Sequence, residues 1–189
     1  MEDQGKLLRK IGPSIKVGLH EWIVTDITRL NTMPLWTNSL TSCVGVAIVT
    51  PTHAFVTHLY SELTSENWEA IVKGEFLKAI SKIDDLNSAR KCVVISGHSE
   101  TLINAVLESV KQIMAGTGCE VSCVKGKSAV SAYFEKGNPC IEVISQADEP
   151  TFKSIMNSTK ESGAQHCKYQ GVFSGVTSSL IGPTYLGKD

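Results

Sequence analysis

The sequence predicts an α+β fold in which a mixed β-sheet, or two packed sheets, carries two amphipathic helices on one side. Two observations predict it. Runs typical of buried strands occur in both halves of the chain, and two segments between them repeat apolar residues at helical spacing. The resulting order, strands, helix, strand, helix, strands, is typical of domains in which helices cover one face of a sheet.

Residues in the N-terminal half are predicted to form strands. Residues 14–26, SIKVGLHEWIVTD, carry apolar side chains at alternate positions from Ile15 onward, so one strand is expected there. Residues 27–35 are expected to connect it to a hairpin. The strands of this hairpin begin close to Cys43 and return through His58.

Two amphipathic helices are predicted next, with a short strand over residues 91–96 between them. The first is expected to begin at Ser65, its capping residue, and the second to follow Gly97. Apolar residues recur at three- and four-residue spacings in both helices. They are Trp68, Ile71, Val72, Phe76, Ala79, Ile80 and Ile83 in the first helix, and Leu102, Ile103, Val106, Leu107, Val110, Ile113 and Met114 in the second.

The C-terminal part is predicted to complete the sheet and then to lose regularity. Three strands are expected over residues 119–124, 128–135 and 140–145. Residues 150–162 have the composition of a short helix. From Gly163 onward the chain is rich in glycine, serine and threonine and has no clear period, so a surface segment is expected there.

Length and composition predict one domain. The chain has 189 residues, of which 42% are hydrophobic and 20% charged, enough for a single buried core. We expect a flexible N-terminus over residues 1–14, a main domain over 15–145, and a C-terminal extension over 146–189 that packs on or beside it. A net charge of -1 without a long basic run argues against nucleic-acid and anionic-membrane partners.

Cysteine usage and hydropathy predict the compartment. Six cysteines lie mostly inside apolar runs, which is typical of buried thiols in a reducing compartment. No apolar run approaches the roughly 20 residues of a spanning helix, and the N-terminal region lacks the pattern of an export signal. We therefore expect the protein in the cytoplasm of the producing cell, or in a host cell that it reaches by a route that needs no signal peptide. We also expect it to be a monomer.

The predicted hairpin brings Cys43 and His58 to one face of the sheet. Either a two-residue or a four-residue loop around Pro51 gives the same register, with Gly45 opposite His58. Diagonal neighbours on one face lie roughly 7 to 8 Å apart, within reach of a cysteine and an imidazole that lean together. Gly45 is expected to leave the ring room to lean. A three-residue loop would turn His58 to the other face.

These residues resemble a known superfamily. The runs VGLHEWIVTD and TNSLTSCVGVAIVTP, followed by a histidine one short strand later, are similar to the protein glutamine deamidases. That superfamily includes the chemoreceptor deamidases (CheD), the catalytic domain of cytotoxic necrotizing factor and the Burkholderia lethal factor. Its catalytic cysteine, the threonine six residues before it and the histidine after it correspond to Cys43, Thr37 and His58. The resemblance covers about residues 15–145.

Departures from the chemoreceptor members favour a toxin- or effector-like member. Those members usually have a glycine pair before the histidine and a Leu-Pro step after it. The chain has AFVTHLYSEL around His58 and ISGHS after the strand over residues 91–96. The resemblance therefore implies the chemistry more strongly than it implies a chemoreceptor substrate.

The resemblance implies a hydrolase that needs no cofactor or metal and acts on a protein with an exposed glutamine. Cys43 would attack the carboxamide carbon, and the backbone N–H groups of Ser42 and Cys43 would stabilise the oxyanion. A protonated His58 would stabilise the thiolate and then protonate the leaving ammonia. Thr37 would orient the imidazole through its hydroxyl or carbonyl oxygen.

Other interpretations remain open for the same residues. A cysteine at a strand start is also typical of a small buried hydrophobe, and Thr37 can be a loop residue that bonds its own backbone. The chain would then be a non-catalytic protein-binding module. Among enzymes, transglutamination and thiol-ester hydrolysis would use the same pair. Papain-like proteolysis is disfavoured, because its histidine lies far downstream of the cysteine.

Further histidines and cysteines are weaker candidates. Cys119 and Cys123 would lie about 13 Å apart along one strand, too far to share a zinc ion. No second pair with ligand spacing joins the adjacent His166 and Cys167. His53 is expected to be a surface or capping residue at the turn. His98 is expected to cap the second helix, and His20 ranks below both as a functional residue.

Overall fold

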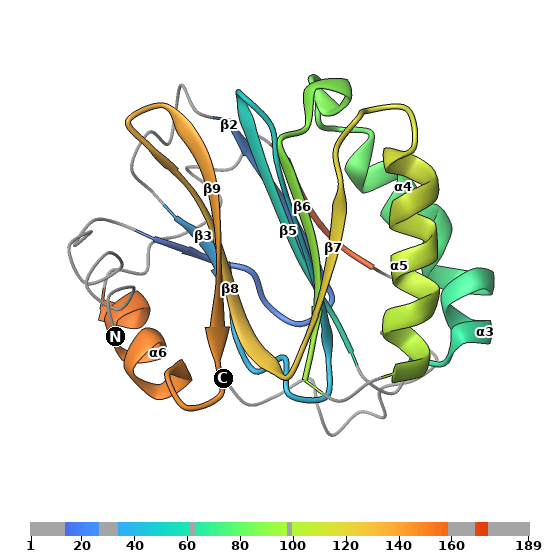
Figure 1. Ribbon diagram of the computed structural model, residues 1–189. Helices are drawn as coiled ribbons and strands as arrows, with labels where there is room; N and C mark the ends of the chain where they lie inside the picture. Colours follow the sequence, from blue (N-terminus) through green and yellow to red (C-terminus); the bar gives the residue numbers. More distant parts are fainter. Residues whose placement is uncertain (1–13, 27–33, 61–62, 98–99, 159–168, 174–189) are drawn as a thin grey trace.

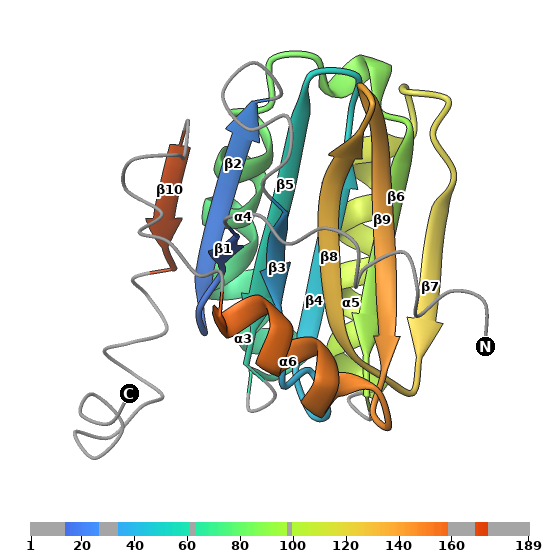
Figure 2. The ribbon, with the colours of Figure 1, turned by 90° about the vertical axis from the view of Figure 1, so that its left-hand side faces the viewer.

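The structure is a computed structural model that describes residues 14–26, 34–60, 63–97, 100–158 and 169–173. Two β-sheets pack face to face, and helices cover the outer face of each (Figures 1 and 2). The strand order is β1-β3-β8-β9 in the four-stranded sheet and β10-β2-β5-β4-β6-β7 in the six-stranded sheet. The predicted α+β sandwich is therefore confirmed.

Strands from distant parts of the chain form the four-stranded sheet. They are β1 (Ile15–Lys16), β3 (Leu35–Thr37), β8 (Lys127–Glu135) and β9 (Asn138–Ser145). β1 pairs in parallel with β3, and the other pairings are antiparallel. The end of β3 carries Thr37, so the first candidate residue belongs to this sheet.

The six-stranded sheet has the predicted hairpin at its centre. Its strands are β10 (Tyr169–Val172), β2 (Glu21–Asp26), β5 (His53–Leu59), β4 (Val44–Val49), β6 (Lys91–Ser96) and β7 (Val121–Lys125). β4 and β5 are antiparallel, and the loop at Pro51 and Thr52 places Gly45 opposite His58. The predicted register is confirmed, so His58 faces the same side of the sheet as Gly45.

Two helical segments cover the outer face of the six-stranded sheet (Figure 1). The first joins α3 (Ser65–Asn67), a π-helical turn η1 (Trp68–Val72) and α4 (Lys73–Ile80), and the second is α5 (Glu100–Met114); a short 3-10 helix, η2 (Leu86–Ser88), precedes β6. Thr64 caps the first segment one residue earlier than predicted, because its hydroxyl accepts the Asn67 N–H at 3.1 Å. The predicted apolar faces of both segments are buried against the sheet.

Near the N-terminus the structure differs from the predicted single strand over residues 14–26. A turn divides this segment into β1 and β2, which belong to different sheets. The Glu21 N–H donates to the Gly18 carbonyl oxygen at 3.1 Å, and His20 has a φ of 60°. A residue in the left-handed region cannot continue a strand, so the chain changes sheets here.

The predicted C-terminal extension is part of the sandwich. α6 (Glu149–Ser158) packs on the outer face of the four-stranded sheet, where Phe152 and Met156 are buried with Trp36. The helices therefore do not all lie on one side. The segment expected to be irregular contains a strand, β10, which pairs with β2. The predictions for residues 1–13 and for the rest of the tail lie outside the described residues.

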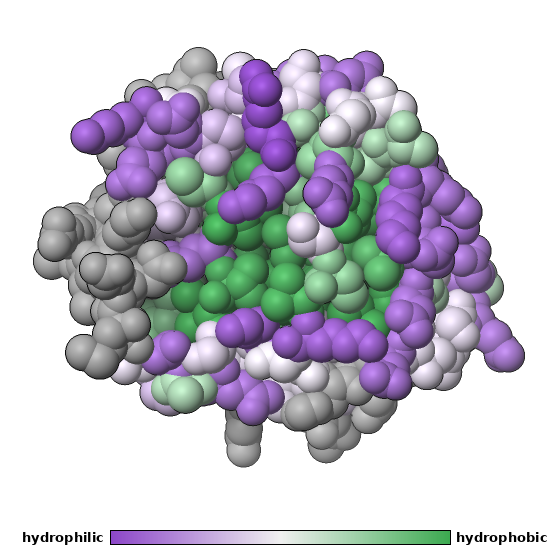
Figure 3. Space-filling model, in the orientation of Figure 1, coloured by the Kyte–Doolittle hydropathy of each residue, from purple (hydrophilic) through white to green (hydrophobic). Residues whose placement is uncertain are grey.

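An apolar core fills the space between the two sheets and reaches the surface at one edge. Half-buried Val124 of β7, and Ile141 and Val143 of β9, border this core. Figure 3 shows apolar side chains gathered between the sheets and framed by hydrophilic ones. Cys43 belongs to the same core, so the candidate site lies between the sheets. No helix among the described residues is long and apolar enough to span a membrane.

Candidate active site

Thr37 and His58 meet between the two sheets. The Thr37 Oγ1 lies 2.8 Å from Nδ1 of His58, and it also donates to the carbonyl oxygen of Val17 at 2.9 Å. A hydroxyl has a single proton, and a carbonyl oxygen can only accept. Thr37 must therefore accept the Nδ1–H of His58. This contact fixes the neutral tautomer in which Nε2 carries the lone pair.

The Nε2 atom of His58 is buried and has no hydrogen-bond partner among the described residues. Burial of the ring, followed by the nearby His20 and Lys16, lowers the pKa of His58 to about 4. His58 is therefore neutral at pH 7. The expected imidazolium at rest is not favoured, and the structure instead offers a neutral base whose lone pair is oriented by Thr37.

Cys43 lies on the same face of the sheet as His58. It directly precedes β4, and only 6% of its surface is exposed. Val44 pairs with Leu59, so the antiparallel register extended by one residue places Cys43 opposite Tyr60. Both residues pack in the core between the sheets. The thiol is therefore on the side to which the imidazole of His58 points.

The expected role of Gly45 is wrong. A Cβ atom at Gly45 would lie 2.8 Å from Cδ1 of Leu40. The space beside Gly45 is therefore occupied by the fully buried Leu40 side chain and is not left for the imidazole. Leu40 belongs to the loop between Thr37 and Cys43, so the glycine allows this loop to pack closely against β4.

Backbone contacts hold the loop over residues 38–42 from two sides. The Leu40 N–H donates to the Ser128 carbonyl oxygen at 2.8 Å, and the Gly97 N–H donates to the Leu40 carbonyl oxygen at 2.9 Å. A Cβ atom at Gly97 would lie 1.9 Å from the Thr41 carbonyl oxygen. The end of β6 therefore touches the loop backbone directly and leaves no room for a side chain.

Glu149 at the start of α6 holds the loop from a third side. Its Oε1 accepts the Ser39 N–H at 2.8 Å and the Asn38 side-chain amide at 3.1 Å. Ser39 has a φ of 62°, a conformation that non-glycine residues adopt only where surrounding contacts hold them. Burial raises the pKa of Glu149, but hydrogen bonds outweigh burial and hold this pKa below its usual value. The carboxylate is therefore a stable acceptor for the loop.

We expect Glu149→Ala to slow alkylation of Cys43 by iodoacetamide about tenfold, because the buried Asn38 amide and the Ser39 N–H lose their acceptor. Glu149→Gln retains Oε1 and should stay within about threefold of the native rate. Peptide-resolved mass spectrometry separates Cys43 from the other cysteines. Equal rates in the native protein and in Glu149→Ala would show that this contact does not position the loop.

The backbone N–H groups predicted to stabilise the oxyanion lie at the boundary between exposed and buried residues. Ser42 is exposed, whereas Cys43 is nearly buried. The backbone N–H groups of these two residues follow the loop that Glu149 and Gly97 fix. Fixed backbone donors can stabilise a developing negative charge without reorganisation, so the rigidity of this loop bears directly on the chemistry of Cys43.

His53 lies at the opposite end of the hairpin and belongs to a structural cluster. Its Nδ1 lies 2.8 Å from Oγ1 of Thr52 and 2.9 Å from Oδ1 of Asp85. Only 5% of its surface is exposed, so the expectation of a surface residue is wrong. Thr50 donates to the same Asp85 oxygen. This cluster ties the hairpin loop to the segment that precedes η2 and leaves His53 outside the candidate site.

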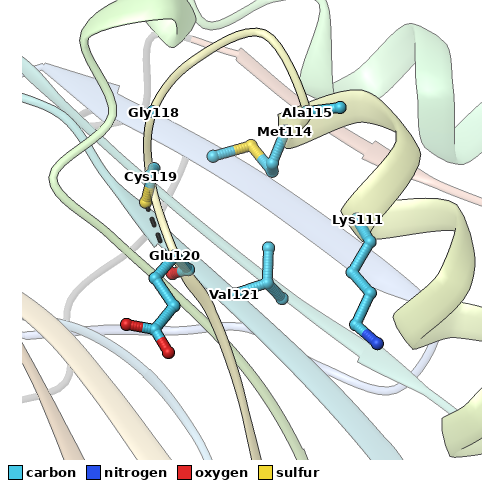
Figure 4. A pocket seen from close by; sticks show the side chains of 7 residues that line it. All are labelled: Lys111, Met114, Ala115, Gly118, Cys119, Glu120 and Val121. Carbon is cyan, nitrogen blue, oxygen red and sulfur yellow. Dashed lines mark hydrogen bonds between the residues drawn. The ribbon is translucent and has the colours of Figure 1, made fainter.

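Among the residues that the structure describes, the other cysteine and histidine candidates do not gather into a site. Cys119 lines a surface pocket with Met114 beside the end of α5 (Figure 4), and neither Cys43 nor His58 lines this pocket. Burial raises the pKa of the Cys119 thiol, so it is a poor nucleophile. The described residues contain no group of three or more side chains that could hold a metal ion. His98, His166 and Cys167 lie outside them.

Comparisons with known proteins identify no relative of this chain, so the site is interpreted from its geometry. A scan against protein-family models finds no match, and a search of curated proteins finds none. The sequence singled out Thr37, Cys43 and His58; the fold joins Thr37 to His58 by a hydrogen bond and places Cys43 on the same face of the sheet as His58. It did not single out Glu149, although a glutamate just before a predicted helix was a usable signal for a contact at that helix start.

Proposed function

We propose that the protein is a cysteine-dependent protein glutamine deamidase. Cys43 is the nucleophile, His58 the proton acceptor and donor, and Thr37 the residue that orients His58. One observation carries the proposal: Thr37 accepts the Nδ1–H of His58, so Nε2 carries the lone pair of a side chain on the same face of the sheet as Cys43. The similarity of the surrounding motifs to the glutamine deamidases supports the same assignment.

The first half of the reaction forms a thioester. Nε2 of His58 takes the thiol proton while Sγ of Cys43 bonds to the carboxamide carbon of the substrate glutamine. Backbone N–H groups at Ser42 and Cys43 stabilise the oxyanion of the tetrahedral intermediate. His58 then gives its proton to the amide nitrogen, the C–N bond breaks and ammonia leaves. The Thr37 oxygen stabilises the transient imidazolium through Nδ1–H.

The second half of the reaction regenerates the thiol. Water replaces ammonia, Nε2 of His58 removes a proton from it, and the hydroxide oxygen bonds to the thioester carbon. The C–S bond breaks, and the proton returns from His58 to Sγ of Cys43. The product is a glutamate on the target protein. Replacing a neutral amide with a carboxylate adds one negative charge, which alters an interface or a switch through ordinary electrostatics.

The lowered pKa of His58 fits this order of events. A histidine with a pKa of about 4 is neutral at the start of the cycle and can accept a proton without first losing one. It becomes charged only while the thiol proton is in transit. Since the departures from the chemoreceptor motifs surround this histidine, we place the chain with toxin- or effector-like members that act on a target in a host cell.

A non-catalytic protein-binding module is the second candidate. The burial of Cys43, which is only 6% exposed and packs in the core between the sheets, favours it. A structural cysteine in such a place would be inert toward alkylating reagents, whereas a thiol whose proton Nε2 of His58 can accept would react, and His58→Ala would slow that reaction. Thiol reactivity therefore separates the two candidates before any substrate is known.

The deciding experiment incubates the protein with cell lysate and searches glutamine peptides by mass spectrometry for conversion to glutamate. We expect conversion by the native protein and by Cys123→Ala, which removes an exposed cysteine of β7. Cys43→Ala and His58→Ala should reduce the rate at least about a thousandfold.

Three other outcomes would contradict the proposal. Conversion that survives Cys43→Ala would exclude the proposed nucleophile. Incorporation of amines in place of water would indicate transglutamination. An inert Cys43, together with no converted glutamine, would favour the binding module.

A further inference from the structure

His20 is a buried imidazole without a hydrogen-bond partner. Only 1% of its surface is exposed, and neither Nδ1 nor Nε2 has a partner among the described residues. A neutral imidazole carries one donor and one acceptor. Leaving both unsatisfied in a protein interior costs stability, and native structures contain few such groups without a functional reason.

The backbone of His20 adds a second cost. Its φ of 60° lies in the left-handed region, which glycine adopts far more readily than a residue with a side chain. The turn from Gly18 to Glu21 therefore has a residue that both its backbone and its burial disfavour. Violations of this kind, where local preference and packing both argue against a residue, concentrate at functional sites.

His20 lies beside the proposed catalytic residues. Its N–H donates to the carbonyl oxygen of His58 at 2.8 Å. Its ring meets the Tyr60 ring edge-on, with 5.7 Å between centroids, and Tyr60 is opposite Cys43 in the extended register of β4 and β5. A charge on His20 also acts on His58. The imidazole of His20 therefore packs against Tyr60, the residue opposite Cys43, and its backbone is bonded to His58.

Burial lowers the pKa of His20 to about 4, so its ring is neutral at pH 7. It then offers an N–H on one side of the ring and a lone pair on the other, and a primary carboxamide can satisfy either of them, the first with its oxygen or the second with its NH2 group. A carboxylate has two acceptors and no donor, so it can satisfy only the N–H. The chemistry of a neutral ring therefore suits the amide substrate better than the acid product.

We propose that His20 is a substrate-positioning residue that binds the carboxamide of the target glutamine and orients its carbon toward Cys43. This inference rests on the proposed deamidase function. It gives His20 a contact with substrate and no part in proton transfer, which belongs to His58. Loss of the imidazole should then affect glutamine conversion while leaving the reactivity of the thiol intact.

His20→Gly tests the proposal, because glycine relieves the positive φ and removes both unsatisfied nitrogens. We expect the rate of glutamine conversion in lysate to fall at least about tenfold, which corresponds to about 1.4 kcal/mol. Alkylation of Cys43 by iodoethanol, which has no amide, should stay within about twofold. The melting temperature should be unchanged or higher. His20→Asn, which tolerates positive φ and keeps a donor and an acceptor, should recover part of the rate.

Each alternative result overturns the proposal in a different way. Conversion that stays within about twofold in His20→Gly would show that the ring makes no productive contact with the amide. A parallel loss of iodoethanol reactivity would assign His20 to the Cys43 and His58 pair instead. A lower melting temperature in both variants would make the ring structural. If the native protein converts no glutamine although Cys43 alkylates rapidly, the proposed function fails first and this inference with it.

Discussion

Replacing Thr37 with valine is expected to slow glutamine conversion about a hundredfold and to lower the free energy of unfolding by about 2 kcal/mol or more. Valine has nearly the shape of threonine but no hydroxyl. The Val17 carbonyl oxygen and Nδ1 of His58 would both lose their buried partner. The ring could then take either tautomer, and the form with the proton on Nε2 cannot accept the thiol proton of Cys43.

Thr37→Ser is the matched control, because it keeps the hydroxyl and loses only a methyl group. We expect it to retain activity within about fivefold and to lower the free energy of unfolding by about 1 kcal/mol. Initial rates on the same glutamine peptides and urea unfolding measure the two effects. If Thr37→Val keeps the native rate, the hydroxyl does not orient His58, and the hydrogen bond at 2.8 Å is structural only.

The hairpin register could be predicted because local rules determine it. Side chains alternate along a strand, so loop lengths of equal parity give the same facing residues, and Gly45 lies opposite His58 as expected. The amphipathic faces of α4 and α5 follow for the same reason, since one helix period decides which residues face the sheet. Such features are determined by residues close together in the sequence, and for this reason the shared face of Cys43 and His58 could be predicted.

The contacts that shape the loop could not be predicted, because they join distant parts of the chain. Glu149 lies 110 residues after Ser39, and no local pattern relates them. The close approach of Leu40 to Gly45 depends on how one loop folds back onto β4. The division of residues 14–26 between two sheets depends on a single left-handed residue, His20, whose burial in turn depends on the assembled sandwich.

The protonation of His58 shows the same limit. A histidine after a cysteine suggested a charged ring that would stabilise a thiolate, because sequence gives no measure of burial. In the folded chain the ring lies between two sheets, and burial is the largest cause of its lowered pKa. The candidate residues of the site could thus be predicted from the sequence, whereas the protonation state of His58 at the start of the reaction could be inferred only from the structure.

Gly97→Ala is expected to destabilise the protein by at least about 3 kcal/mol, or to displace the loop before Cys43. Its Cβ atom would lie 1.9 Å from the Thr41 carbonyl oxygen. The clash is with the backbone of Thr41, which cannot move aside as easily as a flexible side chain. Gly74→Ala is the control, because Gly74 lies in α4 with no atom within 4 Å of an added Cβ. There alanine should stabilise the helix by up to about 1 kcal/mol.

Urea unfolding and Cys43 alkylation together distinguish the two ways in which Gly97→Ala can act. Loss of stability with a native alkylation rate would mean that the folded molecules keep their loop and the clash is absorbed in β6. A slower alkylation rate in molecules that remain folded would mean that the loop has moved. Because Gly97 also donates its N–H to Leu40, we expect the second result. A change that leaves both measurements at native values would show that Gly97 and Thr41 are not in contact, and the loop would then lack one of its three supports.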